Sequence, residues 1–141
     1  MRYWDASAVV PLLVRQRFTS AMEERLAEDA DLITWWGTSI ECYSALMRLV
    51  REGHLGLNEQ GLAERRLREL REGWEEVMPG ETIRRVAERL LRLHVLRAAD
   101  ALQLAAALAI SGPETDRFEW VCLDVRLSDA ARREGFCVIA P

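Results

Sequence analysis

The chain has 141 residues, of which 50% are hydrophobic and 30% charged, a composition that suits one globular domain with a sizeable core. We therefore expect residues 1–141 to form a single domain. The net charge of −4 disfavours a protein that coats nucleic acid by charge alone, but it does not exclude an enzyme that binds one short RNA segment.

All 19 basic residues are arginines, because the sequence contains no lysine. A P-loop NTPase places a lysine on the phosphates of its nucleotide, so that class is excluded. The glycine motifs typical of dinucleotide binding and of serine hydrolases are missing from the sequence as well. These exclusions remove the commonest phosphate- and ester-handling α/β enzymes from consideration.

The sequence predicts a cytoplasmic protein without a membrane segment. Apolar runs such as residues 104–110 are too short to cross a bilayer, and the N-terminus lacks the charged region and long apolar stretch of a signal peptide. Cys42, Cys122 and Cys137 form no C-x-x-C pair. We expect them to be small buried hydrophobic residues and not disulfides or zinc ligands.

Hydrophobic periodicity predicts alternating strands and helices along the chain. The predicted elements are, in chain order, strand 2–4, helix 6–14, helix 19–27, strand 32–36, helix 39–53, helix 59–74, strand 77–78, helix 82–93, helix 98–110, strand 119–123, helix 126–133 and strand 136–139. Ser7 is the expected N-cap of the first helix, which places Pro11 in its first turn. This alternation predicts the α/β class, as a three-layer α/β/α sandwich around a central, mainly parallel sheet of four to five strands.

Four acidic residues stand in apolar surroundings at comparable places in this pattern. Asp5 and Asp124 each follow a predicted strand, whereas Glu41 and Asp100 lie in the first turns of apolar helices. Ligands of open parallel sheets bind beyond the carboxyl ends of the strands, near the point where the strand order reverses. We therefore expect these four side chains to converge on one cleft.

Clustered carboxylates repel one another, so their ionised forms need a compensating positive charge. A site made only of oxygen ligands suits Mg²⁺ or Mn²⁺ better than Zn²⁺. Such a metal orients a water molecule, lowers its pKa and stabilises charge on a phosphate during in-line attack. The four carboxylates therefore favour phosphodiester hydrolysis, which needs neither a lysine nor a catalytic histidine.

Helix capping explains each acidic residue taken alone. Asp5 and Asp124 stand where each would cap the helix that follows. Thr38 and Glu41 have the spacing of a capping box, and Asp100 is favourable in a first turn through the helix dipole. The presence of all four at equivalent ends of the predicted elements favours a shared site.

Four stretches that contain these acids resemble the motifs of the PIN-domain family, and specifically its VapC-type members. They are YWDASAVV at residues 3–10, SIE at 39–41, RAADALQLA at 97–105 and VCLDVRL at 121–127. The third is the most specific, and the resemblance spans the whole chain with the motifs in the family's order. Trp4 and Cys122 are bulkier or softer than the commonest neighbours of these acids, which affects the expected shape of the pocket.

The resemblance implies an Mg²⁺-dependent endoribonuclease, the toxin of a VapBC-type toxin–antitoxin module. By this likeness, Asp5, Glu41, Asp100 and Asp124 bind one or two Mg²⁺ or Mn²⁺ ions, and Ser7 assists by hydrogen bonding near the first aspartate. Activated water then cleaves RNA and leaves a 5′-phosphate.

The family also implies a homodimer and a cognate VapB-like antitoxin that lies across the helices near the active site. An antitoxin arginine that reached the acidic cluster would replace the charge of the metal. Leu12, Leu13, Tyr43 and Met47 are candidates for the antitoxin groove, although helical apolar stripes normally pack inward as core.

Three alternatives stay open beside the toxin. A PIN-domain nuclease that processes RNA without being a toxin would share the same site. A phosphoacceptor receiver domain also gathers aspartates above a parallel sheet, but its partner lysine is missing here. A catalytically silent PIN-like interaction module predicts that the four carboxylates do not converge.

Overall fold

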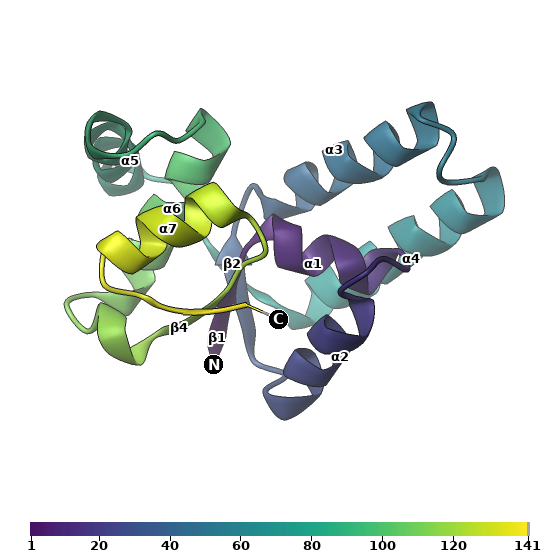
Figure 1. The fold of residues 1–141 in the computed structure, drawn as a ribbon, viewed down its shortest axis with the longest axis horizontal. Helices are drawn as coiled ribbons and strands as arrows, with labels where there is room; N and C mark the ends of the chain where they lie inside the picture. The colour runs from purple at the N-terminus through teal and green to yellow at the C-terminus, as the bar shows by residue number, and fades with distance from the viewer. Residues whose placement is uncertain (141) are drawn as a thin grey trace.

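A computed structural model describes residues 1–140 of the chain as one sheet with helices on both of its faces (Figure 1). The strands are β1 (Arg2–Trp4), β2 (Leu32–Trp35), β3 (Glu75–Val77), β4 (Glu119–Val121) and β5 (Cys137–Ile139). The helices are α1 (Ala6–Leu13), α2 (Thr19–Glu28), α3 (Thr38–Arg51), α4 (Leu57–Gly73), α5 (Glu81–Leu93), α6 (Ala98–Ser111) and α7 (Val125–Arg133), and a short 3-10 helix, η1, covers Thr115–Arg117. Every predicted element is present, and most boundaries agree to within two residues.

The five strands are all parallel and lie in the order β3-β2-β1-β4-β5. The predicted mainly parallel sheet of four to five strands is therefore confirmed. The first strand of the chain lies at the centre, and the order reverses there, since the chain runs outward through β2 and β3 on one side and through β4 and β5 on the other. In such sheets the ligand site lies at this reversal, which here is the edge between β1 and β4.

Alternation along the strands divides the apolar side chains between the two faces. Tyr3 and Trp120 belong to the buried cluster that α5, α6 and α7 complete, whereas Trp4 and Val121 belong to the cluster that α1 to α4 complete. All four side chains are fully buried. Figure 1 shows the same division, with α5 to α7 on the left of the sheet and α1 to α4 on the right. The three-layer sandwich is confirmed.

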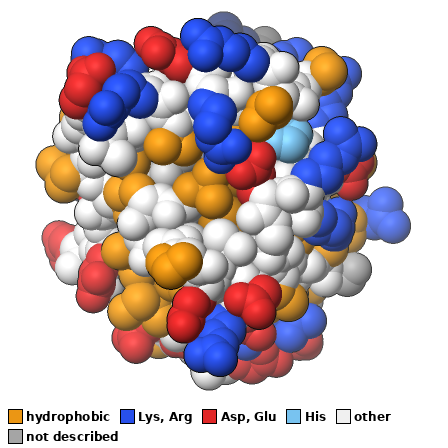
Figure 2. All heavy atoms as spheres, turned by 90° about the vertical axis from the view of Figure 1, so that its left-hand side faces the viewer, with side chains coloured by type: hydrophobic (Ala, Val, Ile, Leu, Met, Phe, Trp, Pro, Cys, Tyr) orange, Lys and Arg blue, Asp and Glu red, His pale blue; other side chains and the backbone are white. Residues whose placement is uncertain are grey.

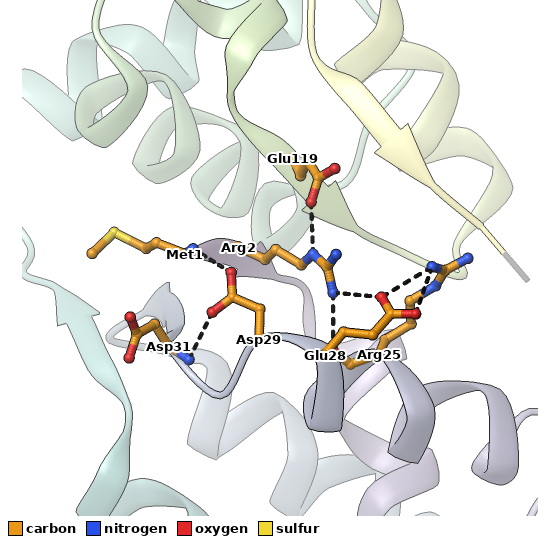
Figure 3. A network of polar contacts seen from close by, with 7 residues as sticks. All are labelled: Met1, Arg2, Arg25, Glu28, Asp29, Asp31 and Glu119. Carbon is orange, nitrogen blue, oxygen red and sulfur yellow. Dashed lines mark hydrogen bonds and ion pairs between the residues drawn. The ribbon is translucent and has the colours of Figure 1, made fainter.

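The amino end of the sheet is tied by a network of ion pairs (Figure 3). Arg2, at the start of β1, donates from Nε to Glu119 of β4 at 2.6 Å and from Nη1 to Glu28 of α2 at 3.1 Å. The Met1 ammonium group contacts the Asp29 carboxylate. The network joins β1 to the neighbouring strand β4 and to helix α2. It lies at the end of the sheet opposite the strand ends that carry the acidic residues.

Two local expectations were wrong. Asp5, and not Ser7, is the N-cap of α1, so the helix begins at Ala6 and Pro11 lies in its second turn. Pro11 has no N–H to donate to the carbonyl of Ser7, so α1 lacks this one helical hydrogen bond. The three cysteines are free thiols, but Cys137 is exposed, contrary to the expected burial of all three.

Within residues 1–140, no single helix is both long and apolar enough to span a membrane. The helices α5 and α6 reach that length and composition only when they are taken together, and they meet at a bend of 119°.

Candidate active site

Asp5 stands directly after β1, at the centre of the carboxyl edge of the sheet. Its backbone N–H donates to the carbonyl oxygen of Val121 at 3.1 Å, which continues the pairing of β1 with β4 by one residue. Its carboxylate Oδ2 accepts hydrogen bonds from the backbone N–H of Ser7, at 2.9 Å, and from the Ser7 hydroxyl. Only 4% of Asp5 is exposed, so the strand end and the helix cap hold one nearly buried carboxylate in place.

Ser7 connects the first acidic residue to the last. While its hydroxyl donates to Asp5, its Oγ accepts hydrogen bonds from the backbone N–H groups of Leu123 at 2.9 Å and Asp124 at 3.1 Å. These two N–H groups belong to the turn between β4 and α7. Ser7 thus forms hydrogen bonds both to Asp5 and to the backbone of the fourth motif, at residues 123 and 124.

Asp124 caps α7, as the sequence predicted. Its Oδ1 accepts a hydrogen bond from the backbone N–H of Leu127 at 2.8 Å. Cys122, two residues earlier, places its Sγ 3.7 Å from Oδ2 of Asp5. Burial raises the pKa of the Cys122 thiol, and the charge of Asp5 raises it further, so the thiol is neutral beside the carboxylates.

Asp100 lies in the first turn of α6, where the predicted helix-start interaction is present. Its Oδ2 accepts a hydrogen bond from the backbone N–H of Arg97, the N-cap residue, at 3.3 Å. The side chain is partly exposed at the edge of the sheet.

Glu41 lies in the first turn of α3, but the capping box predicted with Thr38 does not form. Gly37 is the N-cap, and Thr38 is the first residue of the helix. The Thr38 hydroxyl instead contacts the hydroxyl of Thr34 at 2.6 Å and receives a hydrogen bond from Gln103 at 2.9 Å. Glu41 turns to the same partner, and its Oε1 accepts from Nε2 of Gln103 at 3.1 Å.

Burial and mutual repulsion raise the pKa values of three of the four carboxyls. Desolvation raises the pKa of Glu41 to about 8, and the charges of Asp5 and Asp100 add to the rise. Burial also raises the pKa of Asp5, to which the charges of Asp100 and Asp124 contribute. Desolvation raises the pKa of Asp100, and Asp124 adds to it. The structure therefore brings the four acidic residues near enough to influence one another electrostatically.

The surface around these acids is hollowed on two sides. One hollow, of about 430 Å³, is lined by Ser7, Glu41 and Arg48 among others. A second, of about 490 Å³, is lined by Asp100, Asp124 and the neighbouring arginines Arg97 and Arg126. The nearly buried Asp5 lines neither hollow and stands next in sequence to a residue of the first one, Ala6.

The donor set suits a hard cation, although the side chains are not grouped tightly around one point. Each of the four carboxylates uses one oxygen in a hydrogen bond, and the other oxygen makes none with the residues that the structure describes. Across residues 1–140, no group of three or more His, Cys, Asp and Glu side chains has the arrangement that holds one metal ion. Carboxylate oxygens with free lone pairs fit Mg²⁺ or Mn²⁺ by their chemistry.

Positive charge adjoins the second hollow. Arg97 and Arg126 are exposed, and each lowers the pKa of Asp100 against the larger effect of burial. Neither forms an ion pair with any of the described residues. Figure 2 shows the side of the molecule that carries α5 to α7, where arginine side chains gather along the upper and right-hand borders. The acidic residues thus adjoin a surface with unpaired arginines.

Sequence reasoning missed Gln103 as a member of the site. Its signal was present, because Gln103 and Asp100 are the only polar residues in an otherwise apolar stretch and stand three positions apart on one helical face. Arg97 and Arg126 were missed as well, although each lies within three residues of Asp100 or Asp124 in the sequence, because arginines are spread along the whole chain and nearness in sequence did not single these two out.

Comparison with known proteins agrees with the motifs. No family model matches the chain. Ribonuclease VapC45 from Mycobacterium tuberculosis (strain CDC 1551 / Oshkosh) and Ribonuclease VapC49 from Mycobacterium tuberculosis (strain ATCC 25618 / H37Rv) are each 34% identical to it over 143 residues, covering 99% of this chain and 94% of the relative. Since that identity extends over nearly the full length of both proteins, this chain belongs to the VapC ribonucleases of the PIN-domain family.

Proposed function

We propose that this protein is a metal-dependent endoribonuclease that hydrolyses RNA phosphodiester bonds and acts as the toxin of a VapBC-type pair. The observation that carries the proposal is the placement of Asp5, Glu41, Asp100 and Asp124, from four separate segments, around the reversal point of a parallel sheet. The family of the two ribonuclease relatives supports the same activity.

The four carboxylates would hold one or two Mg²⁺ or Mn²⁺ ions through the oxygens that make no hydrogen bond with described residues. When bound, such an ion supplies an activated water and stabilises negative charge on the phosphate that is attacked. In the metal-free protein, Glu41 carries a proton at neutral pH, because its pKa is about 8. Metal binding therefore displaces that proton, and affinity rises with pH.

Two arginines beside the carboxylates would contribute to RNA binding. Arg97 and Arg126 present guanidinium groups beside Asp100 and Asp124, where they would bind phosphates that flank the one to be cleaved. Ser7 keeps Asp5 and the Asp124 turn in a fixed relation. This arrangement lets a chain with a net charge of −4 bind a polyanion locally.

A VapB-like antitoxin, a second copy of this chain and a cytoplasmic location complete the proposal. Of the four residues expected in an antitoxin groove, Leu13 is buried in the core and is withdrawn, while Leu12 and Met47 pack partly against the core. Tyr43 is 40% exposed and lines a hollow of about 350 Å³ between α3 and α4. That hollow supports a partner helix on this face.

The test is cleavage of single-stranded RNA by purified protein with Mg²⁺ or Mn²⁺. We expect cleavage that EDTA stops and Mn²⁺ restores, and we expect Asp5→Ala and Asp100→Ala to abolish it while the circular dichroism spectrum is retained. Asp116→Ala is the matched control, because Asp116 is exposed and lies in η1. If Asp5→Ala or Asp100→Ala cleaved RNA at the parental rate, the assignment of the site would be wrong.

Of the three alternatives, the receiver domain lacks its lysine, and the other two differ from the toxin in their experimental outcomes. A silent interaction module would cleave no RNA with any divalent cation. A processing nuclease would cleave RNA but would not arrest the growth of a host that expresses it without an antitoxin. The proposed toxin arrests growth, and Asp100→Ala relieves the arrest.

A further inference from the structure

The amide side chain of Gln103 is completely buried, with 0% of the residue exposed. Its Nε2 donates to two oxygens, Oε1 of Glu41 at 3.1 Å and the Thr38 hydroxyl at 2.9 Å. Its Oε1 accepts from the Tyr3 hydroxyl at 2.8 Å. A buried amide of this kind is stable only when its donors and acceptor are satisfied, and here one of the partners is a carboxylate of the proposed site.

Tyr3 decides which end of the amide faces Glu41. The phenol lies in β1, is fully buried, and reaches both the side-chain oxygen of Gln103 and its backbone carbonyl, at 2.9 Å. The phenol has a single proton, which it shares between these two accepting oxygens, so the amide oxygen of Gln103 is held on the Tyr3 side. The NH₂ group is thereby directed at Glu41, whose Oε1 accepts its hydrogen bond.

We propose that Gln103 is a positioning residue, set by Tyr3, that fixes the Glu41 carboxylate by holding Oε1 and leaving Oε2 for a divalent cation. This inference rests on the proposed function. It assigns Gln103 an effect on the metal through Glu41, since Gln103 itself offers no free oxygen. An outer partner of this kind typically changes metal affinity or activity by about 10- to 100-fold when it is removed.

The geometry offers a substitution that isolates this role. Gln103→Met keeps an unbranched side chain of similar length in the core. The Tyr3 hydroxyl still has the carbonyl oxygen of residue 103 as its acceptor, and Thr38 still has Thr34. Glu41 is the one described partner of Gln103 that is left without any side-chain hydrogen bond. Because the other partners keep theirs, we expect the variant to fold.

The experiment compares Gln103→Met with Gln60→Met in the full chain. Gln60 donates to Glu64 at 2.9 Å on the surface of α4, so it is a matched glutamine–glutamate pair away from the sheet edge. We expect Gln103→Met to weaken Mn²⁺ binding, measured by calorimetry, by about 10-fold or more and to lower kcat with little change in the KM for RNA. Gln60→Met should match the parent in both.

Tyr3→Phe tests the orientation step. We expect an intermediate loss of Mn²⁺ affinity, because the amide is then free to turn, and no further loss when Tyr3→Phe is added to Gln103→Met. Such non-additivity means that Tyr3 acts through Gln103. Additive losses would overturn this part of the inference, since they would mean that each residue acts separately.

A metal-independent readout separates this inference from the proposed function. In the metal-free protein, ¹³C relaxation of the Glu41 methylene groups should report a rigid side chain that becomes mobile in Gln103→Met. If the parent bound no Mn²⁺ and cleaved no RNA, the proposed function would fail, and the inference with it. Parental Mn²⁺ affinity and Glu41 rigidity in Gln103→Met would overturn the inference and leave the function standing.

Discussion

The Oγ of Ser7 lies 3.1 Å from the backbone nitrogen of Asp124, a residue 117 positions later in the chain. The same hydroxyl donates to Asp5, so one small side chain sets the relation between the first and last carboxylates of the proposed site. Cys122 also contacts both residues, but through longer sulfur contacts, at 3.7 Å to Oδ2 of Asp5 and at 3.5 Å to the backbone carbonyl of Asp124. A substitution at Ser7 should therefore affect both the proposed site and the stability of the fold.

Ser7→Ala should affect both stability and cleavage. The substitution leaves the N–H groups of Leu123 and Asp124 without their acceptor, and one buried group left unsatisfied costs about 1–3 kcal/mol. We expect a loss of that order in urea unfolding and a fall in kcat. Ser44→Ala, at an exposed serine of the same hollow, is the control and should leave both unchanged. Equal unfolding midpoints for the two variants would contradict the structural role of the Ser7 hydrogen bonds to Asp5, Leu123 and Asp124.

Stability of the metal-free protein should depend on pH through Glu41. Its folded-state pKa of about 8 lies above the ordinary value of 4.5, so the folded protein holds this proton more tightly than the unfolded chain does. The contribution is fully present below about pH 4.5 and is lost as the pH rises through about 8. We expect the Tm in EDTA to fall across this window and Mn²⁺ to raise it most at the alkaline end.

Glu41→Gln provides the control for this pH dependence, because the amide does not titrate. Its Tm should vary less with pH across the same window, and Mn²⁺ should raise it less than it raises that of the parent. The carboxylates whose pKa values are lowered, Glu28, Asp29, Glu64 and Glu134, change protonation below their ordinary values and so act outside the window. The pKa values of Asp5 and Asp100 are raised as well, but both residues are present in parent and variant, so the difference between the two profiles reports Glu41. Parallel profiles for parent and variant would refute the assignment to Glu41.

Asp124→Asn should separate helix capping from metal binding. Asparagine caps a helix about as well as aspartate, so α7 and the bond from Leu127 are retained. The substitution removes one negative charge from the proposed metal site, and we expect loss of RNA cleavage at nearly parental stability. Asp124→Ala should lose cleavage and also about 0.5–2 kcal/mol of stability. If the asparagine variant kept the parental activity, Asp124 would serve only as the N-cap of α7 and not as a metal ligand.

Arg126→Gln should weaken RNA binding with little effect on kcat. Removing one phosphate contact to single-stranded RNA should reduce the slope of log K against log[salt] by about 0.7. Arg117→Gln is the control, because Arg117 is exposed, lies in η1 and pairs with Glu114. If both variants shift the slope equally, the effect comes from net charge and not from a site at Arg126.

Periodicity was sufficient to predict the fold because the elements alternate cleanly. Each strand is short and, apart from β3 with its two glutamates, largely apolar, and turn residues separate the strands from helices with apolar stripes. The sheet with helices on both faces therefore follows from local pattern. The N-cap of α1 was misassigned to Ser7 because Asp5 and Ser7 are both good N-cap residues, although the predicted start at Ala6 was correct. Their tertiary bonds decide between them, since Ser7 is engaged by Leu123 and Asp124.

For the acidic residues, the two interpretations of the sequence are not exclusive. Asp5 and Asp124 cap helices with one oxygen each, and they also influence each other across the sheet edge. Glu41 differs, because a buried amide replaces the expected cap. That partner is distant in sequence, at residue 103, so only the packing of α6 against β2 brings it to Glu41.

The central position of β1 bears on how the protein is made. The strand β1 needs β2 and β4 as neighbours, and β4 begins only at residue 119. Contacts so far apart in sequence form late, after the intervening chain has been synthesised. A chain that has not been synthesised as far as β4 therefore lacks Asp124 and the hydrogen bonds from Ser7 to the turn that carries it, so the proposed carboxylate site forms only after residue 124 has been added.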